Sequence, residues 1–213
     1  MNNNFDGIIF DMDGILMDVS KSYREAIRLT ASNFLKRKVK RTEVNKIKNR
    51  VGMNNDWVAT YRLINNPSIP YENVKSYFQG LYLGNLKRKG LIENETLLIS
   101  KKILNQIKNK YKKLAIATGR PRKEVQYVIK KNKLEGLFDC IVAMEDIVKG
   151  KPAPDILLAV IKKMKLKNTV YIGDSPSDII AADKAGILSI YVGIQKIGSI
   201  RFSSVLQVIK YLL

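Results

Sequence analysis

The sequence contains no histidine, and a single cysteine, Cys140, among its 213 residues. Without histidine the chain cannot build a serine–histidine–aspartate triad, a histidine metal site or an imidazole general base. One cysteine excludes an internal disulfide and a cysteine zinc cluster, and its position in the strand-like run Phe138–Val142 indicates a buried thiol. Any catalysis must therefore rely on carboxylates, lysines, hydroxyl groups and a hard metal ion.

Long hydrophobic runs are also absent. No apolar stretch approaches the roughly 20 residues that a membrane-spanning helix needs, and the first residues, Met1–Asn4, lack the basic-then-apolar pattern of a secretory signal. Hydrophobic residues make up 46% of the chain and charged residues 27%, as in ordinary globular proteins with a substantial core. We therefore expect a cytoplasmic protein without a membrane partner. The sequence leaves its oligomeric state open.

Acidic residues are few beside basic ones: 19 Asp and Glu against 38 Lys and Arg give a formal net charge of +19. A nucleic-acid-binding protein would more often gather such charge on one face or in a recognisable motif. Here the lysines fall mostly on the polar sides of predicted helices, beside Ile and Leu at helical spacing. We interpret them as a solvated surface that also attracts anionic small molecules. A non-catalytic nucleic-acid-binding protein remains the alternative.

The most informative stretch is Phe5–Asp18, with the sequence FDGIIFDMDGILMD. Within it, Gly7–Phe10 is a short apolar run of the kind that forms a buried strand of a parallel sheet. Asp11 then stands at the carboxyl end of that strand, where open α/β sheets bind ligands, and Asp13 points to the same side two residues later. Two neighbouring carboxylates repel each other unless a cation or a proton intervenes. The pair therefore indicates an active site, with an acidic turn after a strand as the alternative.

Residues 18–90 are predicted to form a separate small helical unit. Ser22–Glu25 matches a capping box, which would open a helix that continues to Leu35. No part of the segment has the pattern of a strand. Further helices are predicted at Thr42–Lys48, from Asp56 through Leu63 and at Tyr71–Leu86, with a loop at Arg50–Asn55.

From residue 91 onward, predicted strands and helices alternate. The strands are Leu114–Ala117, Cys140–Ala143, Thr169–Ile172 and Ile187–Val192. The helices are Thr96–Asn109, Pro121–Asn132, Pro154–Met164, Pro176–Ala185 and Ser203–Leu213. Together with residues 1–17, residues 91–213 therefore predict an α/β domain built on a doubly wound parallel sheet, with helices on both of its faces.

Four polar clusters follow the ends of four separate predicted strands: Asp11–Asp13, Thr118–Arg120, Lys151–Pro152 and Gly173–Asp178. The carboxyl ends of parallel strands meet at one rim of a sheet, so these side chains can share one cleft. Their order and spacing resemble subfamily I of the haloacid dehalogenase superfamily, chiefly its phosphatases, in which they are the four signature motifs. The helical segment at residues 18–90 matches the cap of that superfamily in position.

The resemblance implies a phosphatase that cleaves a small phosphomonoester through an aspartyl-phosphate. Asp11 would be the nucleophile, and Asp13 would protonate the leaving oxygen and then deprotonate water. Thr118 and the amide of Gly119 would bind phosphoryl oxygens. Lys151 would offset the negative charge of the nucleophile and the phosphoryl group.

The resemblance also implies a hard divalent cation, most simply Mg²⁺. Its ligands would be the Asp11 carboxylate, the Asp13 backbone carbonyl and the Asp174 carboxylate. Three roles are open for Asp178: it binds the metal through water, it orients Lys151, or it stabilises the start of a helix.

Three arginines are candidates for substrate binding. Arg120 stands where many relatives have a small or amide residue, and it either touches substrate or forms an exposed salt bridge. Arg24 and Arg50 lie near the start of the predicted cap and in its glycine-containing loop, where each is either a reader of the leaving group or a surface residue. The runs Asp18–Arg24 and Ala117–Pro121 resemble a subgroup associated with histidine biosynthesis. Histidinol phosphate therefore joins phosphoglycolate and sugar phosphates as a candidate substrate.

Two other activities use the same core. A phosphomutase would keep all four motifs but release no free phosphate, and it remains an alternative. A haloacid dehalogenase would not need Asp13, because halide leaves without protonation. The presence of this second acid therefore favours phosphate chemistry.

Overall fold

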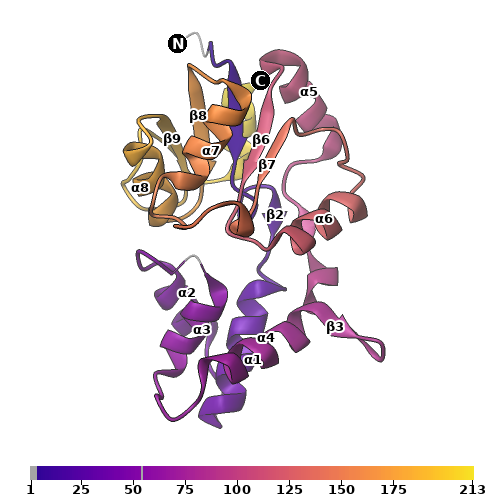
Figure 1. Ribbon diagram of the computed structural model, residues 1–213, viewed down its shortest axis with the longest axis vertical. Helices are drawn as coiled ribbons and strands as arrows, with labels where there is room; N and C mark the ends of the chain where they lie inside the picture. The colour runs from indigo at the N-terminus through magenta and orange to yellow at the C-terminus, as the bar shows by residue number, and fades with distance from the viewer. Residues whose placement is uncertain (1–3, 54) are drawn as a thin grey trace. The chain divides into compact units, whose positions relative to one another are not determined.

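The computed structural model describes residues 4–53 and 55–213; Met1–Asn3 and Asn54, which belongs to a predicted loop, lie outside the described residues. The chain divides into two compact units (Figure 1). The first comprises the residues up to Met17 together with Leu97–Leu213, and the second comprises Asp18–Thr96. None of the described helices is long and apolar enough to cross a membrane.

A six-stranded sheet forms the centre of the first unit (Figure 1). Its strand order is β10-β9-β8-β1-β6-β7, and every neighbouring pair is parallel, which confirms the predicted sheet. Because β1 lies between β8 and β6, the segments that follow these three strands emerge side by side at one edge. The strands are β1 (Gly7–Phe10), β6 (Leu114–Ala117), β7 (Cys140–Val142), β8 (Thr169–Gly173), β9 (Leu188–Val192) and β10 (Ile200–Phe202).

Helices cover both faces of this sheet. Helices α7 (Asp155–Met164) and α8 (Pro176–Lys184) pack on the face toward which Ile9 and Tyr171 point, in one hydrophobic cluster. Right-handed crossovers place α5 (Lys101–Tyr111) and α6 (Arg122–Lys131) on the other face. There α9 (Val205–Leu212) joins them, since the Tyr111 hydroxyl donates to the Leu212 carbonyl at 2.9 Å. The strands β1, β6 and β8 are buried along their whole length, as their apolar sequences predict.

Some boundaries in the first unit differ from the prediction. Helix α5 begins at Lys101 instead of Thr96, because the Ser100 side chain caps it and Leu97 belongs to a short strand. Pro121 precedes α6 as its cap and is not its first residue. Strand β10 was not predicted. Its three residues lie just after a glycine- and serine-containing turn, and they offer too short a pattern to recognise.

The second unit contains the four predicted helices. They are α1 (Tyr23–Leu35), α2 (Arg41–Lys48), α3 (Asp56–Ile64) and α4 (Tyr71–Leu83). Two pairs of short strands also occur: β2 (Met17–Asp18) with β5 (Thr96–Leu97), and β3 (Gly84–Asn85) with β4 (Arg88–Lys89). Short 3₁₀ turns lie at Leu91–Asn94 in the second unit and at Met144–Asp146 in the first.

The prediction extended helix α4 to Leu86, but the helix ends at Leu83. Gly84 has a φ of 75°, and a Cβ on it would collide with the backbone of Arg88 and Gly90. Only glycine combines this conformation with so close an approach. The chain therefore turns here into a two-residue hairpin, which the prediction of a unit without strands did not include.

The predicted capping box at the start of α1 is wrong. The Ser22 hydroxyl donates to Oε1 of Glu95 at 2.8 Å and makes no cap bond. Glu25, the expected reciprocal partner, binds Arg28 at 2.9 Å. Glu95 is buried and also accepts the Tyr82 hydroxyl at 2.9 Å. A tertiary contact with a buried carboxylate has therefore replaced the local cap.

Candidate active site

Asp11 lies directly beyond the end of β1, in the first unit. Its amide donates to the Ile172 carbonyl at 2.8 Å, which continues the pairing of β1 with β8 by one residue. The Lys151 ammonium lies 2.9 Å from Oδ1 of Asp11, and the lysine side chain is only 2% exposed. The structure therefore brings together the predicted nucleophile and the predicted lysine, 140 residues apart in the chain.

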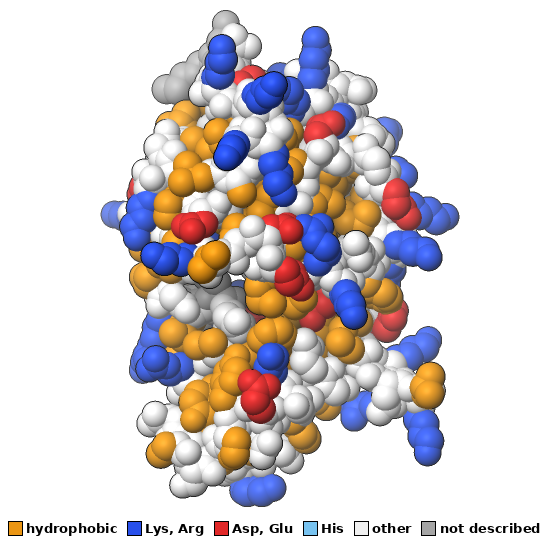
Figure 2. Space-filling model, viewed as in Figure 1, with side chains coloured by type: hydrophobic (Ala, Val, Ile, Leu, Met, Phe, Trp, Pro, Cys, Tyr) orange, Lys and Arg blue, Asp and Glu red, His pale blue; other side chains and the backbone are white. Residues whose placement is uncertain are grey.

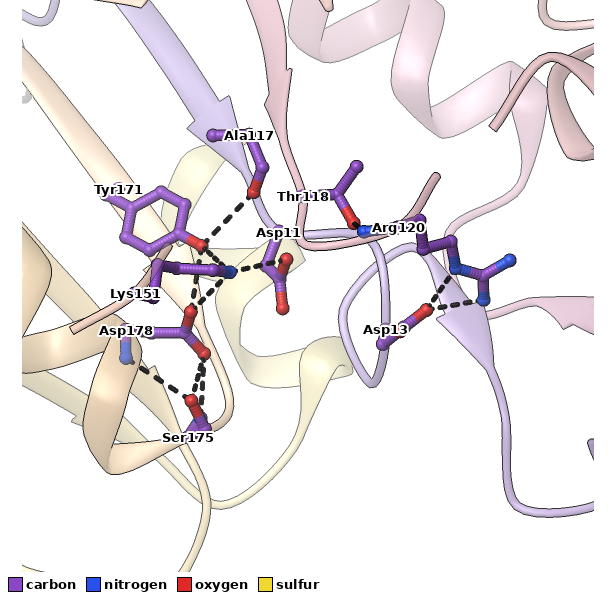
Figure 3. A network of polar contacts seen from close by, with 9 residues as sticks. All are labelled: Asp11, Asp13, Ala117, Thr118, Arg120, Lys151, Tyr171, Ser175 and Asp178. Carbon is purple, nitrogen blue, oxygen red and sulfur yellow. Dashed lines mark hydrogen bonds and ion pairs between the residues drawn. The ribbon is translucent and has the colours of Figure 1, made fainter. Parts of the chain in front are cut away.

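Lys151 belongs to a buried network that includes the side chains of Asp11, Tyr171 and Asp178 (Figure 3). Besides Asp11, it contacts Oδ1 of Asp178 at 2.6 Å and donates to the Tyr171 hydroxyl at 2.8 Å. That hydroxyl in turn donates to Oδ1 of Asp178 at 3.0 Å. Sequence reasoning missed Tyr171. The available signal was a polar hydroxyl group in an otherwise apolar strand, two residues before Gly173 and hence on the same side of the strand.

Asp178 is held by protein groups at both carboxylate oxygens. Oδ1 receives Lys151 and Tyr171, and Oδ2 accepts from the Ser175 amide at 3.0 Å and from its hydroxyl at 2.6 Å. Gly173 leaves room for this arrangement, because a Cβ there would overlap the Asp178 side chain. Asp178 therefore contacts Lys151 and caps the start of α8, as two of its three predicted roles require, while its role in orienting Lys151 stays a prediction. The metal-binding role stays a prediction.

Three carboxylates gather where a metal was predicted. One oxygen from each of Asp11, Asp174 and Asp178 lies within 4.8 Å of the others. Gly14 has a φ of 74°, and a Cβ on it would collide with Oδ2 of Asp174, so its bare backbone leaves the space that this carboxylate occupies. Hard divalent cations prefer oxygen ligands, and this donor set fits Mg²⁺. Ligation by the Asp13 carbonyl stays a prediction.

Charges in this cluster shift one another's pKa values. Burial raises the pKa of Asp11 well above its usual range, Lys151 opposes the shift, and Asp178, Asp13 and Asp174 add to it. Burial also acts to raise the pKa of Asp178, but the Lys151 ammonium holds it below its usual value. For Lys151, burial is outweighed by its two carboxylate neighbours, and its pKa is raised. Lys151 and Asp178 are therefore charged, while a cation beside Asp11 would favour its ionised form.

The predicted phosphoryl-binding pair follows β6, the strand next to β1. Thr118 is buried, and its hydroxyl oxygen accepts from the Arg120 amide at 3.2 Å, which leaves its own hydrogen available for a ligand. Gly119 is exposed, with open space where a Cβ would stand. Its amide has no hydrogen-bond partner within the described chain. Both groups are therefore able to bind an oxyanion.

Arg120 is buried and pairs with Asp13. Its side chain is 1% exposed, its Nε donates to Oδ1 of Asp13 at 2.5 Å, and Nη2 forms an ion pair with the same oxygen (Figure 3). Arg120 therefore forms a salt bridge, but its guanidinium is buried and not exposed as expected. Its partner is Asp13, the predicted general acid. Contact of Arg120 with substrate stays a prediction.

The two arginines predicted in the cap differ in their surroundings. Arg24 is half-buried, and its Nη1 donates to Oδ1 of Asn45 at 3.1 Å. It lines a cavity of about 460 Å³ within the second unit. Arg50 is exposed and is not among the residues that line this cavity. The other lining residues are Ser20, Glu25, Arg41, Val44, Asn45 and Asn49.

Basic side chains are spread over the face seen in Figure 2, interleaved with acidic and hydrophobic ones, and form no single continuous patch on it. This distribution supports the interpretation of the lysines as a solvated surface.

Comparisons with known proteins agree with the architecture. Residues 8–192 match the family of haloacid dehalogenase-like hydrolases. The chain is 31% identical over 193 residues to a phosphorylated carbohydrates phosphatase of Thermotoga maritima, and the match covers 87% of this chain and 84% of that one. A haloacid dehalogenase superfamily hydrolase of subfamily IA from Geobacter sulfurreducens has the same fold, with a TM-score of 0.69 at 16% identity over 100% of this chain and 99% of that one.

A further relative is longer than this chain. It is an imidazoleglycerol-phosphate dehydratase of Phytophthora nicotianae, 35% identical over 191 residues. The match covers 85% of this chain but only 42% of that protein. The chain therefore spans less than half the length of this relative.

Proposed function

The chain belongs to the haloacid dehalogenase-like hydrolase family, as one of its phosphatases, and from this premise we propose that it hydrolyses a small organic phosphomonoester through an aspartyl-phosphate. The observation that carries the proposal is the buried pair of Asp11 and Lys151 at the end of β1. Thr118 follows the neighbouring strand β6, and Asp174 follows β8 on the other side. The residues proposed as nucleophile, counter-charge, oxyanion donor and second acid thus share one edge of the sheet.

In the first step, a carboxylate oxygen of Asp11 forms a bond to phosphorus while the bond from phosphorus to the leaving oxygen breaks. Asp13 gives its proton to that oxygen, and the alcohol departs. In the second step, Asp13 takes a proton from water as the water oxygen attacks phosphorus. Inorganic phosphate then leaves, Asp11 returns to its carboxylate form, and Asp13 is again protonated.

Asp11 and Asp174 would hold a Mg²⁺ ion, with the Asp13 carbonyl as a further ligand. When bound, the cation supplies positive charge that screens the clustered carboxylates and the phosphate. We assign Asp178 to orienting Lys151, because both of its oxygens already have protein partners. Thr118 and the Gly119 amide would bind the phosphoryl oxygens, and Lys151 would offset the charge that develops on them.

Two relatives support a choice of substrates to test first. The Thermotoga maritima protein is named for phosphorylated carbohydrates, which supports sugar phosphates. The Phytophthora nicotianae protein is named for a phosphate ester that carries an imidazole. Histidinol phosphate has the same two groups and so belongs in the first set, together with phosphoglycolate. The second unit, with its arginine-lined cavity, would recognise the organic group.

A screen of phosphate release across phosphorylated metabolites, with and without Mg²⁺, tests the proposal. We expect metal-dependent release from at least one alkyl phosphomonoester, and none from Asp11→Asn. Interconversion of sugar phosphates without free phosphate would overturn hydrolysis in favour of a phosphomutase. No turnover, together with salt-dependent affinity for DNA or RNA, would favour the nucleic-acid-binding alternative.

A further inference from the structure

The pairing of Arg120 with Asp13 is one-sided. Both Nε and Nη2 of the guanidinium contact the same oxygen, Oδ1. A guanidinium fork more commonly meets a carboxylate with one nitrogen on each oxygen. Within the described residues, no group donates a hydrogen bond to the other oxygen of Asp13, Oδ2. The Asp13 side chain is 31% exposed and is therefore accessible to solvent.

Arg120 is well placed to hold this oxygen still. Its amide donates to the Thr118 hydroxyl at 3.2 Å, and its carbonyl accepts from the Met144 amide at 3.0 Å. Its side chain is 1% exposed, so burial restricts the long stem as well. Because the guanidinium is buried, breaking its contact with Asp13 would be costly, which favours keeping the contact throughout the reaction.

The contact is compatible with both protonation states of Asp13. An ionised carboxylate accepts at Oδ1, and so does the carbonyl oxygen of a neutral carboxyl group that carries its proton on Oδ2. The Asp13 side chain therefore need not rotate when the proton leaves or returns. Oδ1 would thus anchor the Asp13 carboxyl group, and Oδ2 would exchange the proton.

We propose that Arg120 is a positioning residue that fixes Asp13 through Oδ1, so that Oδ2 is the oxygen that gives and takes the catalytic proton. The inference rests on the proposed function, in which Asp13 is the general acid and base. In the first step the proton passes from Oδ2 to the leaving oxygen, and in the second it returns to Oδ2 from water. Arg120 itself neither binds the substrate nor exchanges a proton.

The test compares Arg120→Lys and Arg120→Met with Arg122→Met, on p-nitrophenyl phosphate and on an alkyl phosphate. Arg122 is the matched control, since it lies two residues along and pairs with Asp146 instead of Asp13. General acid catalysis contributes roughly 10²- to 10⁴-fold, so a misdirected acid should lower kcat for the alkyl phosphate by about 10- to 100-fold. Turnover of p-nitrophenyl phosphate, which needs little protonation, should stay within a few-fold, with KM unchanged on both substrates.

The lysine variant keeps the charge but offers one nitrogen in place of two, so it should recover part of the alkyl phosphatase activity. If Arg120→Met does not fold, Arg120→Lys alone decides the comparison. The double variant Asp13→Asn/Arg120→Lys should be no slower than Asp13→Asn. Equal losses on both substrates, a loss confined to KM, or additive losses in the double variant would overturn the inference. A loss confined to KM would indicate instead that Arg120 binds substrate.

Crystal structures of the wild type and the Arg120 variants test positioning without any turnover. We expect the Asp13 carboxylate to leave its wild-type position when the guanidinium is removed. An Asp13 carboxylate that keeps its place would overturn the inference, even in an active phosphatase. If the wild type releases phosphate from no substrate, the proposed function fails, and the same crystal structures still report on the contact.

Discussion

The hydroxyl oxygen of Tyr171 lies 2.8 Å from the ammonium nitrogen of Lys151. Burial, together with the negative charges of Asp11 and Asp178, raises the pKa of Tyr171 well above its usual value. The hydroxyl therefore stays neutral and keeps its proton for Asp178. Tyr171 thus links Lys151 to the buried carboxylate of Asp178.

Tyr171→Phe removes this hydroxyl and keeps the ring. Lys151 retains its two carboxylate partners but loses one hydrogen bond, worth about 1 kcal/mol. We expect kcat to fall by about tenfold with little change in KM, measured by steady-state kinetics on an alkyl phosphate. Tyr111→Phe is the matched control, because its hydroxyl bonds to the Leu212 carbonyl on the other face of the sheet. Equal losses in the two variants would contradict a specific role for Tyr171.

The four polar clusters were predictable because each follows a short apolar run, and periodicity identifies such runs without knowledge of their neighbours. The partners of Tyr171 and Arg120 were not predictable in this way. They depend on β1 lying between β8 and β6, and strand order is a tertiary property that local pattern does not contain. Most residues of the candidate site are therefore predictable from the sequence, but the contacts between them are not.

Errors in the second unit have the same origin. The motif at Ser22 is a good local cap, yet its hydroxyl binds Glu95, 73 residues away. Glu95 is buried, and a buried carboxylate without hydrogen-bond donors is costly, so the tertiary contact wins. The end of α4 at Gly84 likewise depends on a backbone approach that only the folded hairpin creates.

Activity should depend on Asp11 and on a divalent cation. Asp11→Asn keeps the shape of the side chain but removes the nucleophilic carboxylate, so we expect turnover to fall at least about a thousandfold. Excess chelator should abolish activity in the wild type, and added Mg²⁺ should restore it. Asp183→Asn, a change at an exposed aspartate, is the control. Near-normal rates in Asp11→Asn or in chelator would rule out the proposed mechanism.

The role of Asp13 is distinguishable from that of Asp11 by the leaving group. Asp13→Asn removes the proton donor, which a good leaving group such as p-nitrophenolate needs less than an alkoxide does. We therefore expect the loss of kcat to be at least about tenfold greater on an alkyl phosphate than on p-nitrophenyl phosphate. Parallel losses on the two substrates would show that Asp13 is not the general acid.

Stability should depend on pH through Asp139. Burial acts to raise its pKa, but the Lys108 ammonium at 2.5 Å and the Leu114 amide at 2.8 Å hold it below its usual value. A lowered folded-state pKa stabilises the protein above the unfolded-state pKa of about 3.9, and the effect is lost as the pH falls through the folded value.

Asp139→Asn should therefore be less stable than the wild type at pH 7, and the difference should shrink below about pH 4. Urea denaturation at pH 7, 5 and 3 measures it, with Asp183→Asn as the control. A difference that stays constant down to pH 3 would exclude a charge effect.

Substrate selection is expected in the second unit, because the proposed function assigns the groups at the sheet edge to phosphorus, metal and charge. The cavity there has a volume of about 460 Å³, within the range of small-molecule pockets. Glu25 in its wall is neutralised by Arg28, with contacts at 2.9 and 2.5 Å, which leaves Arg24 and Arg41 as its net positive charge. Such a wall suits an anionic or hydroxylated organic group.

We expect Arg24→Ala to lower kcat/KM for the best natural substrate by roughly 1–3 kcal/mol, and to leave p-nitrophenyl phosphate hydrolysis within a few-fold of the wild type. Arg50→Ala is predicted to have the same selective effect if its loop reads the substrate. Arg62→Ala, at an exposed position on α3, is the control for loss of a positive charge. If both substrates fall together in Arg24→Ala, the residue stabilises the unit through its bond to Asn45 and does not select substrate. If hydrolysis of neither substrate falls in Arg24→Ala, the cavity does not select the substrate. A loss in Arg50→Ala that Arg62→Ala does not show would then assign selection to the loop that contains Arg50.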